Sequence, residues 1–438
     1  MDTILRIIQV ILALSILVIF HEFGHYTFAR LFKIRVEQFY LFFPPAIFKW
    51  KPKKSDTEFG IGSIPLGGFC KISGMIDESL DTNQMKHDPQ PWEFRSKPAW
   101  KRLFVMSGGV LFNFILAFIL FSAIMNTWGT QYLKNSDAKY GIEVNDLAKE
   151  IGFRSGDKIL SFDGEAIDDF NDLQVTLARN QAKTATVIRQ GDTINIDIDP
   201  VYIPAILNTP GMFAPATPIA IASVPDTSIN ASANLLANDR FISVDTVKVV
   251  TLYELKSALN LYKGKRVDFR FLRGDQIKTI PLQVSENATI GVLLASDISD
   301  MNITRIDYNF FSSIPAGWDK FSSTLSNYIK ELGLIFQPKT QAYKSVGSFI
   351  AIGKIFPTSW DWRIFWNICA WLSVMLGVMN LLPIPGLDGG HILFTLYEII
   401  TRKKPSDRFL INAQIVGMAI LFLLIFVAFG NDIMRLIN

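Results

Sequence analysis

Two histidines and a glutamate near the start of the chain have the residue types and spacing of a metal-dependent hydrolase. They are His21, Glu22 and His25, in the sequence HEFGH. On a helix, residues four apart share a face, so both imidazoles can bind one metal ion. The carboxylate beside His21 can then act as a general base on a water that the metal activates. The motif therefore predicts zinc-dependent hydrolysis of amide bonds.

The motif closes an apolar run that is long enough to cross a membrane. The run extends from Ile4 to Phe20 and leads directly into His21. A charged side chain in the middle of a bilayer costs roughly 2.5 to 3.5 kcal/mol, so ionisable residues there usually serve a function. A removable signal peptide is the competing interpretation, but no small-residue cleavage site follows the run, and cleavage would discard the histidines. We therefore expect a zinc site at membrane depth.

A third ligand is expected at the end of a later apolar segment. Residues 380–391 read NLLPIPGLDGGH, in which two prolines interrupt a helical pattern and Asp388 lies at membrane depth. Prolines free backbone groups that must be satisfied inside the protein, which favours a pocket over a lipid-facing surface. Asp388 would complete a set of two histidines and one carboxylate and leave the fourth zinc position to water. His391 competes as a ligand, but it lies one helical turn further along, and we expect it outside the ligand set.

The composition indicates a protein that is part membrane and part soluble. Of 438 residues, 49% are hydrophobic, too many for an ordinary soluble enzyme, and 19% are charged, too many for membrane segments alone. Four apolar windows have about the 20 residues that a spanning helix needs. They are residues 4–23, 103–125, 364–382 and 410–429.

Basic residues predict the orientation of these spans. They cluster after the first window, before the second and between the third and fourth, as in Arg30, Arg102 and Lys403. By the positive-inside rule those segments are cytoplasmic, which places both chain ends and residues 126–362 on the other side, the periplasm of a bacterium. The net charge of +3 is small and indicates no nucleic-acid partner. The two cysteines, Cys70 and Cys369, fall in different regions, so we expect no disulfide.

The long polar region contains an internal repeat with an offset of 82 residues. Gly156-Asp157 aligns with Asn238-Asp239, and Leu173 aligns with Leu255. Such a period indicates a duplicated domain. Each copy is expected to hold short strands and one helix. The predicted strands include residues 194–198 and 267–272, and the predicted helices cover 169–178 and 252–259.

The first copy resembles a PDZ domain, whose groove binds an extended peptide at a sheet edge. Its candidate groove strand consists of Gly141, Ile142, Glu143 and Val144. Ala220–Val224 is the matching strand of the second copy. There Asn234 and Asn238 replace Gly152 and Gly156, and asparagine tolerates left-handed conformations better than other non-glycine residues. A pair of β domains that serve only as a spacer is the alternative.

The ordered combination of motifs resembles the site-2 protease family (peptidase family M50), most closely its sigma-E-regulating bacterial branch. Residues 64–69 resemble the family's re-entrant β segment, and residues 107–114 its G-x-x-x-N segment. The resemblance implies that His21, His25 and Asp388 bind zinc and that Glu22 is the catalytic base. It also implies that the substrate backbone is held by a further set of residues, although simple helix packing is an equal alternative for Asn380. That set is Pro65, Leu66, Gly67, Gly68, Asn113 and Asn380.

The expected fold is a multi-pass α-helical membrane protein with four transmembrane helices, a re-entrant β segment and two periplasmic α+β PDZ-like domains. Residues 315–336 have apolar side chains at helical spacing, which suits an amphipathic helix at the membrane surface or a core helix of the second PDZ copy. The expected parts are residues 1–28 (first span with HExxH), 29–100 (cytoplasmic and β segment), 101–126 (second span), 127–208 and 209–300 (the PDZ copies), 301–361 (amphipathic linker), 362–390 (third span with the LDG motif) and 391–438 (cytoplasmic loop and fourth span).

The expected activity is cleavage of single-pass transmembrane substrates within the membrane. The family resemblance implies that these are an anti-sigma factor already trimmed on its outer side and remnant signal peptides, and that the enzyme is a monomer in the lipid of the bacterial inner membrane. The PDZ copies would either exclude bulky substrates or bind a newly made C-terminus. Two other classes stay open: an inactive PDZ membrane scaffold, and a metal-ion transporter that uses the same three ligands.

Overall fold

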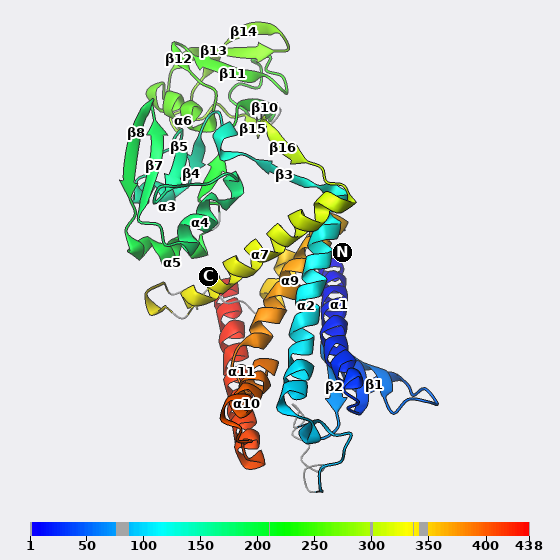
Figure 1. The fold of residues 1–438 in the computed structure, drawn as a ribbon. Helices are drawn as coiled ribbons and strands as arrows, with labels where there is room; N and C mark the ends of the chain where they lie inside the picture. The colour runs from blue at the N-terminus through cyan, green and yellow to red at the C-terminus, as the bar shows by residue number, and fades with distance from the viewer. Residues whose placement is uncertain are drawn as a thin grey trace. The chain divides into compact units, whose positions relative to one another are not determined.

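The computed structural model describes residues 2–75, 87–209, 211–297, 301–335, 337–340 and 349–437 (Figure 1). Their contacts divide the chain into two units. The first unit comprises the described residues within 1–129, 307–336 and 343–438, and the second those within 130–306 and 337–342. The second unit is thus an insertion into the sequence of the first.

Four helices of the first unit are long and apolar enough to span a membrane. They are α1 (Asp2–Leu31), α2 (Ala99–Trp128), α9 (Trp362–Leu381) and α11 (Asp407–Ile437). These helices confirm the four predicted windows. The third ends at Leu381, earlier than the predicted boundary at 390, because Pro383 and Pro385 cannot continue a helix.

Helices α1 and α2 pack backbone against backbone at a pair of glycines. A Cβ atom added to Gly24 would lie 2.2 Å from the carbonyl oxygen of Gly108, and one added to Gly108 would lie 2.6 Å from that of Gly24. Small residues permit this close approach, which is a common way to join membrane helices. The contact brings the HExxH face of α1 directly against α2.

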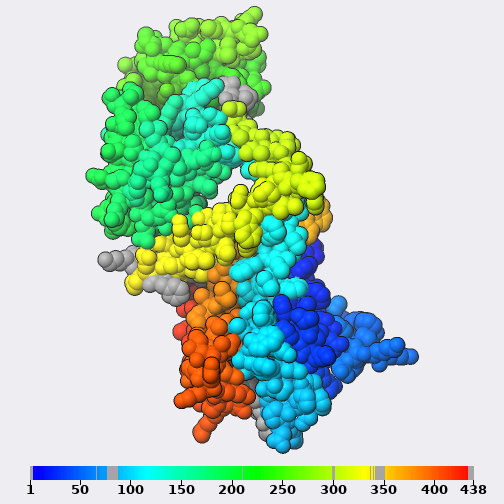
Figure 2. All heavy atoms as spheres, in the orientation of Figure 1, coloured from blue at the N-terminus to red at the C-terminus, as the bar shows by residue number. Residues whose placement is uncertain are grey.

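A β-hairpin lies between α1 and α2. Its strands β1 (Val36–Trp50) and β2 (Glu58–Ile72) pair antiparallel, but both are bent, so Tyr40 pairs with Gly60 on one side and with Phe69 on the other. The hairpin therefore forms four short segments in the order 46–50, 58–62, 38–41 and 68–72. Its tip projects from the helices (blue in Figure 2) and exposes Ile47 and Phe48.

Three further helices complete the first unit: α7 (Phe310–Ile335), α8 (Phe349–Ile355) and α10 (Asp388–Thr401). In Figure 1, α7 runs obliquely across α2 and α9. It buries Phe321 against Phe121 of α2 and Ala370 of α9. Of the two alternatives for this segment, the core helix of the second repeat copy is therefore wrong, because its apolar face packs on α2 and α9.

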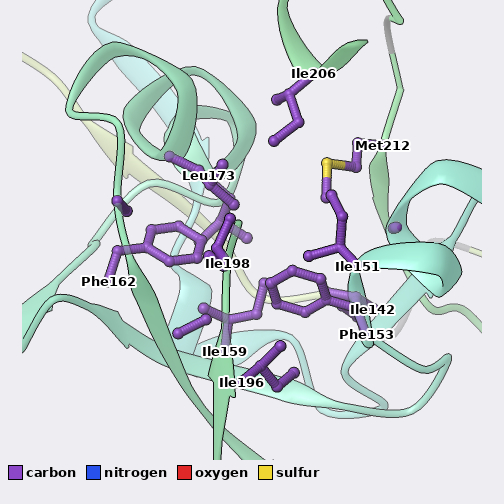
Figure 3. Close-up of a cluster of buried hydrophobic side chains, with 14 of the residues drawn as sticks. Ile142, Ile151, Phe153, Ile159, Phe162, Leu173, Ile196, Ile198, Ile206 and Met212 are labelled. Carbon is purple, nitrogen blue, oxygen red and sulfur yellow. The ribbon is translucent and has the colours of Figure 1, made fainter. Parts of the chain in front are cut away.

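The first repeat copy is built around a four-stranded sheet in the order β6-β5-β7-β8. A two-stranded pair, β4 with β9, lies beside it. Figure 3 shows core side chains from β4, β5 and β8 and from the helices α3, α4 and α5 lying together. The elements are β4 (Ile142–Val144), α3 (Asp146–Ile151), β5 (Lys158–Phe162), β6 (Glu165–Ala166), α4 (Leu173–Arg179), β7 (Thr184–Arg189), β8 (Asp192–Asp197), α5 (Ile203–Asn208) and β9 (Phe213–Pro215).

The second copy repeats this arrangement in one sheet, in the order β14-β13-β11-β10-β15, with β12 paired to β11. Strand β10 pairs with β15 as β4 pairs with β9, which confirms the duplication predicted from the sequence. Outside both copies, β3 (Thr130–Leu133) pairs with β16 (Ile303–Ile306). The second copy consists of β10 (Ile219–Ser223), β11 (Arg240–Val244), β12 (Val247–Lys248), α6 (Leu252–Leu261), β13 (Arg266–Arg273), β14 (Gln276–Gln283) and β15 (Leu293–Ser296).

The turns of the two copies have matching backbone conformations. Gly152 and Gly156 have φ of +118° and +92°, and Asn234 and Asn238, which replace them, have φ of +50° and +70°. The prediction that asparagine adopts the left-handed conformation at these positions is confirmed. Substitution of glycine by asparagine thus preserves the turn.

Each copy also contains one buried aspartate–arginine pair. Arg189 donates two hydrogen bonds to Asp157, both at 2.7 Å, and Arg273 does the same to Asp239, at 2.7 and 2.6 Å. The aspartate of each pair also accepts a backbone N–H, from Arg154 in the first copy and from Leu236 in the second. In the first copy the pair connects the glycine turn to β7, and in the second copy it connects the asparagine turn to β13.

Candidate active site

Three predicted ligand atoms converge between α1 and α10. Nε2 of His21 and Nε2 of His25 each lie 3.2 Å from Oδ2 of Asp388, and the two Nε2 atoms are 3.3 Å apart. No other group of three or more His, Cys, Asp or Glu side chains in the described part of the chain is arranged to hold a metal ion. Asp388 is more than 360 positions from the two histidines in the sequence, and the fold brings the three together.

The chemistry of this cluster fits zinc. Oδ2 of Asp388 is buried and accepts no well-directed hydrogen bond from any described residue, although two imidazoles are close to it. Two imidazole nitrogens and one carboxylate oxygen make the donor set of catalytic zinc sites, which keep a fourth position open. The three side chains are 8% to 13% exposed. His21, His25 and Asp388 would therefore hold the ion in a shielded position.

The loop after α9 delivers Asp388 to this position. Helix α10 begins at Asp388, so the carboxylate lies at a helix N-terminus, where the helix dipole favours a negative charge. The chain folds closely over this first turn: a Cβ atom on Gly389 would lie 2.1 Å from the carbonyl oxygen of Leu382, and one on Gly390 would lie 2.7 Å from Cα of Pro385. The two glycines after Asp388 are thus required by the close approach of the loop.

Helix α2 forms the wall behind the two histidines. The carbonyl oxygen of Val105 lies 2.9 Å from Nδ1 of His25, and Nδ2 of Asn113 lies 3.1 Å from Nδ1 of His21. Between them, a Cβ atom on Gly109 would lie 2.5 Å from both Cε1 of His21 and Nε2 of His25. Residues 105, 109 and 113 are spaced by four and therefore share one face of the helix.

Glu22 lies beside the edge segment of the β-hairpin. The backbone N–H of Cys70 donates a hydrogen bond to the Glu22 carboxylate. A Cβ atom on Gly68 would meet the side chain of Val18 at 2.6 Å and Cγ of Glu22 at 3.7 Å. Of the predicted substrate-binding residues, Pro65, Leu66, Gly67 and Gly68 all belong to β2, and a side chain at position 68 would contact the predicted catalytic base.

The two predicted asparagines both contact His21. Nδ2 of Asn380, on α9, lies 3.4 Å from Nε2 of His21, on the side that faces the metal position. Asn113 is fully buried behind the ring and reaches its other nitrogen. His391 lies outside the ligand cluster and lines a separate small pocket with Arg102 and Phe394. The sequence motifs do not indicate which of the two asparagines lies behind His21 and which faces the metal position.

The predicted groove strand lies in the second unit and has its backbone occupied on both sides. Ile142 donates to the carbonyl of Asp157 and accepts from the N–H of Gly156, while β4 pairs with β9 on its other side. The backbone N–H of Val144 donates to the hydroxyl of Ser155. An added peptide strand would have to displace the turn at residues 155–157.

The site combines two histidines and a carboxylate around one point with a glutamate beside them. It belongs to a chain with helices able to span a membrane. These features together define a membrane-bound metalloprotease. The chain belongs to peptidase family M50, whose model matches residues 9–424. It is 27% identical to Metalloprotease MmpA of Caulobacter vibrioides, over 98% of this chain and 96% of that protein. It is also 28% identical to proteins of Borreliella burgdorferi and Rickettsia conorii whose names contain the words zinc metalloprotease, over at least 98% of each chain. The chain is thus a zinc metalloprotease of the site-2 type.

Proposed function

We propose that this enzyme cleaves transmembrane helices inside the bilayer, with His21, His25 and Asp388 as zinc ligands and Glu22 as the general base. The observation that carries the proposal is the convergence of the three ligand atoms beside Glu22, where His21 and His25 lie on a helix of membrane-spanning length and Asp388 begins the shorter helix α10. A metal site that served only structure would have its fourth position filled by protein. Here the described cluster supplies three ligands, so the fourth position would fall to water.

The chemistry follows from the roles of these residues. When bound, zinc supplies a Lewis acid that activates water and polarises the scissile carbonyl. Glu22 accepts a proton from the attacking water and transfers it to the leaving amine. The N–H of Cys70, hydrogen-bonded to the Glu22 carboxylate, holds the base in place.

A helical substrate must unwind before it is cut, because its carbonyls are engaged in hydrogen bonds four residues apart. Segment 68–72 of β2 lies at the edge of the hairpin, and a side chain at position 68 would contact Glu22, so the segment is suited to pair with an unwound strand. Asn380 lies next to the metal-facing nitrogen of His21, where its amide can bind a substrate carbonyl. Both features favour substrate alignment by β2 and Asn380.

The two repeat copies act, in this proposal, as PDZ-like domains that exclude substrates with a large outer domain. The hydrogen bonds of Ile142 to the turn at 156–157 leave its backbone edge occupied, which favours a steric role over capture of a C-terminus at β4. The basic segments near α1, α2 and α10 favour an inner-membrane orientation with the active site toward the cytoplasm and these domains in the periplasm. Trimmed anti-sigma factors and remnant signal peptides are the corresponding substrates, and the enzyme acts as a monomer.

The first experiment compares the wild-type protein with the Glu22→Gln variant in detergent. Bound zinc is measured together with cleavage of a helical model substrate trimmed on its outer side. We expect about one zinc per chain in both proteins and a loss of at least 10³-fold in cleavage for the variant, because only the base is removed. If both bind zinc and the variant cleaves as fast as the wild type, Glu22 is not the base. If neither cleaves any trimmed helix, an inactive scaffold or a metal transporter becomes the better explanation.

A further inference from the structure

The two zinc-binding histidines need different partners from the same helix. A neutral imidazole that binds zinc through Nε2 must carry its proton on Nδ1, so Nδ1 needs a hydrogen-bond acceptor. For His25 that acceptor is the carbonyl oxygen of Val105, 2.9 Å away. For His21 the neighbouring group is the amide of Asn113, which offers either a donor or an acceptor.

The amide of Asn113 is turned the wrong way for a zinc-bound His21. Its Nδ2 faces Nδ1 of His21 at 3.1 Å, which makes Nδ1 the acceptor and would place the ring proton on Nε2, the atom aimed at Asp388. Meanwhile Oδ1 of Asn113 is buried and receives no hydrogen bond from any described residue. A buried acceptor without a donor costs about 1 to 3 kcal/mol. A half-turn of the amide would exchange the two atoms.

We propose that Asn113 is a positioning residue for zinc: its Oδ1 accepts the proton of His21 Nδ1 in the metal-bound enzyme and thereby leaves Nε2 free to bind the ion. The side chain is fully buried, and its own carbonyl oxygen accepts a 2.7 Å hydrogen bond from Ser373 of α9, which holds the backbone there. Val105 and Asn113 thus present one oxygen to each histidine from a single face of α2. Asn113 acts on His21 from behind the ring.

The experiment measures zinc affinity by competition with a chelator, using full-length protein in detergent. Asn113→Leu keeps the size of the side chain and removes the acceptor, and we expect a zinc dissociation constant 10- to 100-fold higher. Asn113→Asp keeps an acceptor oxygen in both orientations, and we expect an affinity within about threefold of the wild type or tighter, since carboxylate–histidine–zinc arrangements are common. The control is Asn367→Leu, which makes the same change on α9. The side chain of Asn367 donates a hydrogen bond within its own helix, to the backbone carbonyl of Arg363.

A second measurement needs no variant. The chain has four histidines, and nitrogen-15 labelling of all four lets the zinc ligands be recognised by the signals that shift when a chelator removes the metal. We expect both shifted imidazoles to carry a proton on Nδ1. A zinc-binding imidazole without a proton on Nδ1 would overturn the inference. Wild-type zinc affinity in Asn113→Leu would also overturn it, as would an equal loss of zinc affinity in Asn113→Asp and Asn113→Leu.

The inference rests on the zinc site proposed above, and the two can fail separately. If His21→Ala retains the zinc affinity of the wild type, the proposed ligand set is wrong. If His21→Ala loses zinc while Asn113→Leu keeps it, the ligand set stands and only the role of Asn113 falls.

Discussion

At the scale of single residues, the site depends on how closely α2 approaches the two histidines. His21 and His25 share a face of α1, but the orientation of their rings is determined by Val105, Gly109 and Asn113 of α2. Residues that orient metal ligands affect affinity nearly as much as the ligands do. The absence of a side chain at Gly109 is therefore as important as the presence of the histidines.

This dependence predicts that Gly109→Ala disrupts the zinc site. The new methyl group would lie 2.5 Å from atoms of both rings, so the rings must turn or the helices must separate. We expect zinc affinity to fall at least 10-fold, measured by chelator competition. Gly333→Ala on α7 is the matched control, because a Cβ atom there meets nothing within 4 Å. Equal zinc affinity in Gly109→Ala and the control would show that the rings have more freedom than the contacts allow.

At the scale of elements, ionic contacts hold the pieces that carry the site and the repeats. In the first unit, Arg102 of α2 pairs with Glu398 of α10 at 2.5 Å, which fastens the helix that begins at Asp388. In the second unit, each repeat copy holds its turn through one aspartate–arginine pair. Because the aspartate of each repeat pair is buried, removing its arginine leaves a charge without compensation.

The pair in the second copy predicts a dependence of local stability on pH. Burial alone raises the pKa of Asp239, but the hydrogen bonds from Arg273 and from the N–H of Leu236 outweigh it, so the pKa is lowered from its ordinary value. A lowered pKa stabilises the folded state above the unfolded-state value, near pH 4, and this stabilisation is lost as the pH falls through the folded-state pKa. We therefore expect β11 and β13 to open more readily below about pH 4.

Hydrogen exchange of the full-length protein, corrected for the intrinsic effect of pH, measures this opening. Asp239→Asn is expected to raise exchange of β11 and β13 already at pH 6 and to weaken the further rise at low pH, since the titrating group is gone. Asp226→Asn removes the same charge from an exposed position and should behave like the wild type. If exchange in Asp239→Asn equals that of the wild type at pH 6, the pair does not stabilise the sheet.

At the scale of the whole molecule, the chain joins a helical unit that carries the site to a sheet-containing unit inserted in its sequence. Residues 130–306 interrupt the first unit between α2 and α7, and α7 packs on the helices α2 and α9. The predicted zinc ligands and the predicted base all lie within the first unit. In the proposed function, the second unit selects substrates and contributes none of these residues.

This arrangement predicts that the second unit controls access. Replacing residues 130–306 with a short flexible linker should leave zinc binding intact and allow cleavage of a substrate that keeps its outer domain, because the excluding bulk is removed. Glu143→Lys reverses a charge in β4 and should leave the preference for trimmed substrates unchanged within about twofold, a change worth only ~0.4 kcal/mol. Cleavage assays with trimmed and untrimmed versions of one substrate measure both effects. A loss of trimmed-substrate cleavage in Glu143→Lys alone would instead favour peptide binding at β4.

The sequence by itself determined the elements and the reactive residues of this protein. Hydrophobic runs predicted four spanning helices, the 82-residue offset predicted a duplicated domain, and the spacing of His21, Glu22 and His25 with Asp388 predicted a metal site. These signals are local, because span length, helical spacing and turn conformation depend on neighbouring residues in the chain. The same local patterns left open whether residues 315–336 form an amphipathic helix at the membrane surface or a core helix of the second repeat copy.

Only the tertiary structure decided which residues meet. The packing of Gly24 on Gly108 brings α2 behind the histidines, the bend of β2 places Gly68 near Glu22, and the prolines after α9 turn Asp388 toward α1. Asn113 and Asn380 look equivalent in sequence, yet one lies behind His21 and the other faces the metal position. Such contacts join residues that are far apart in the chain, so they follow from the close approach of whole helices and strands and cannot be read from local spacing.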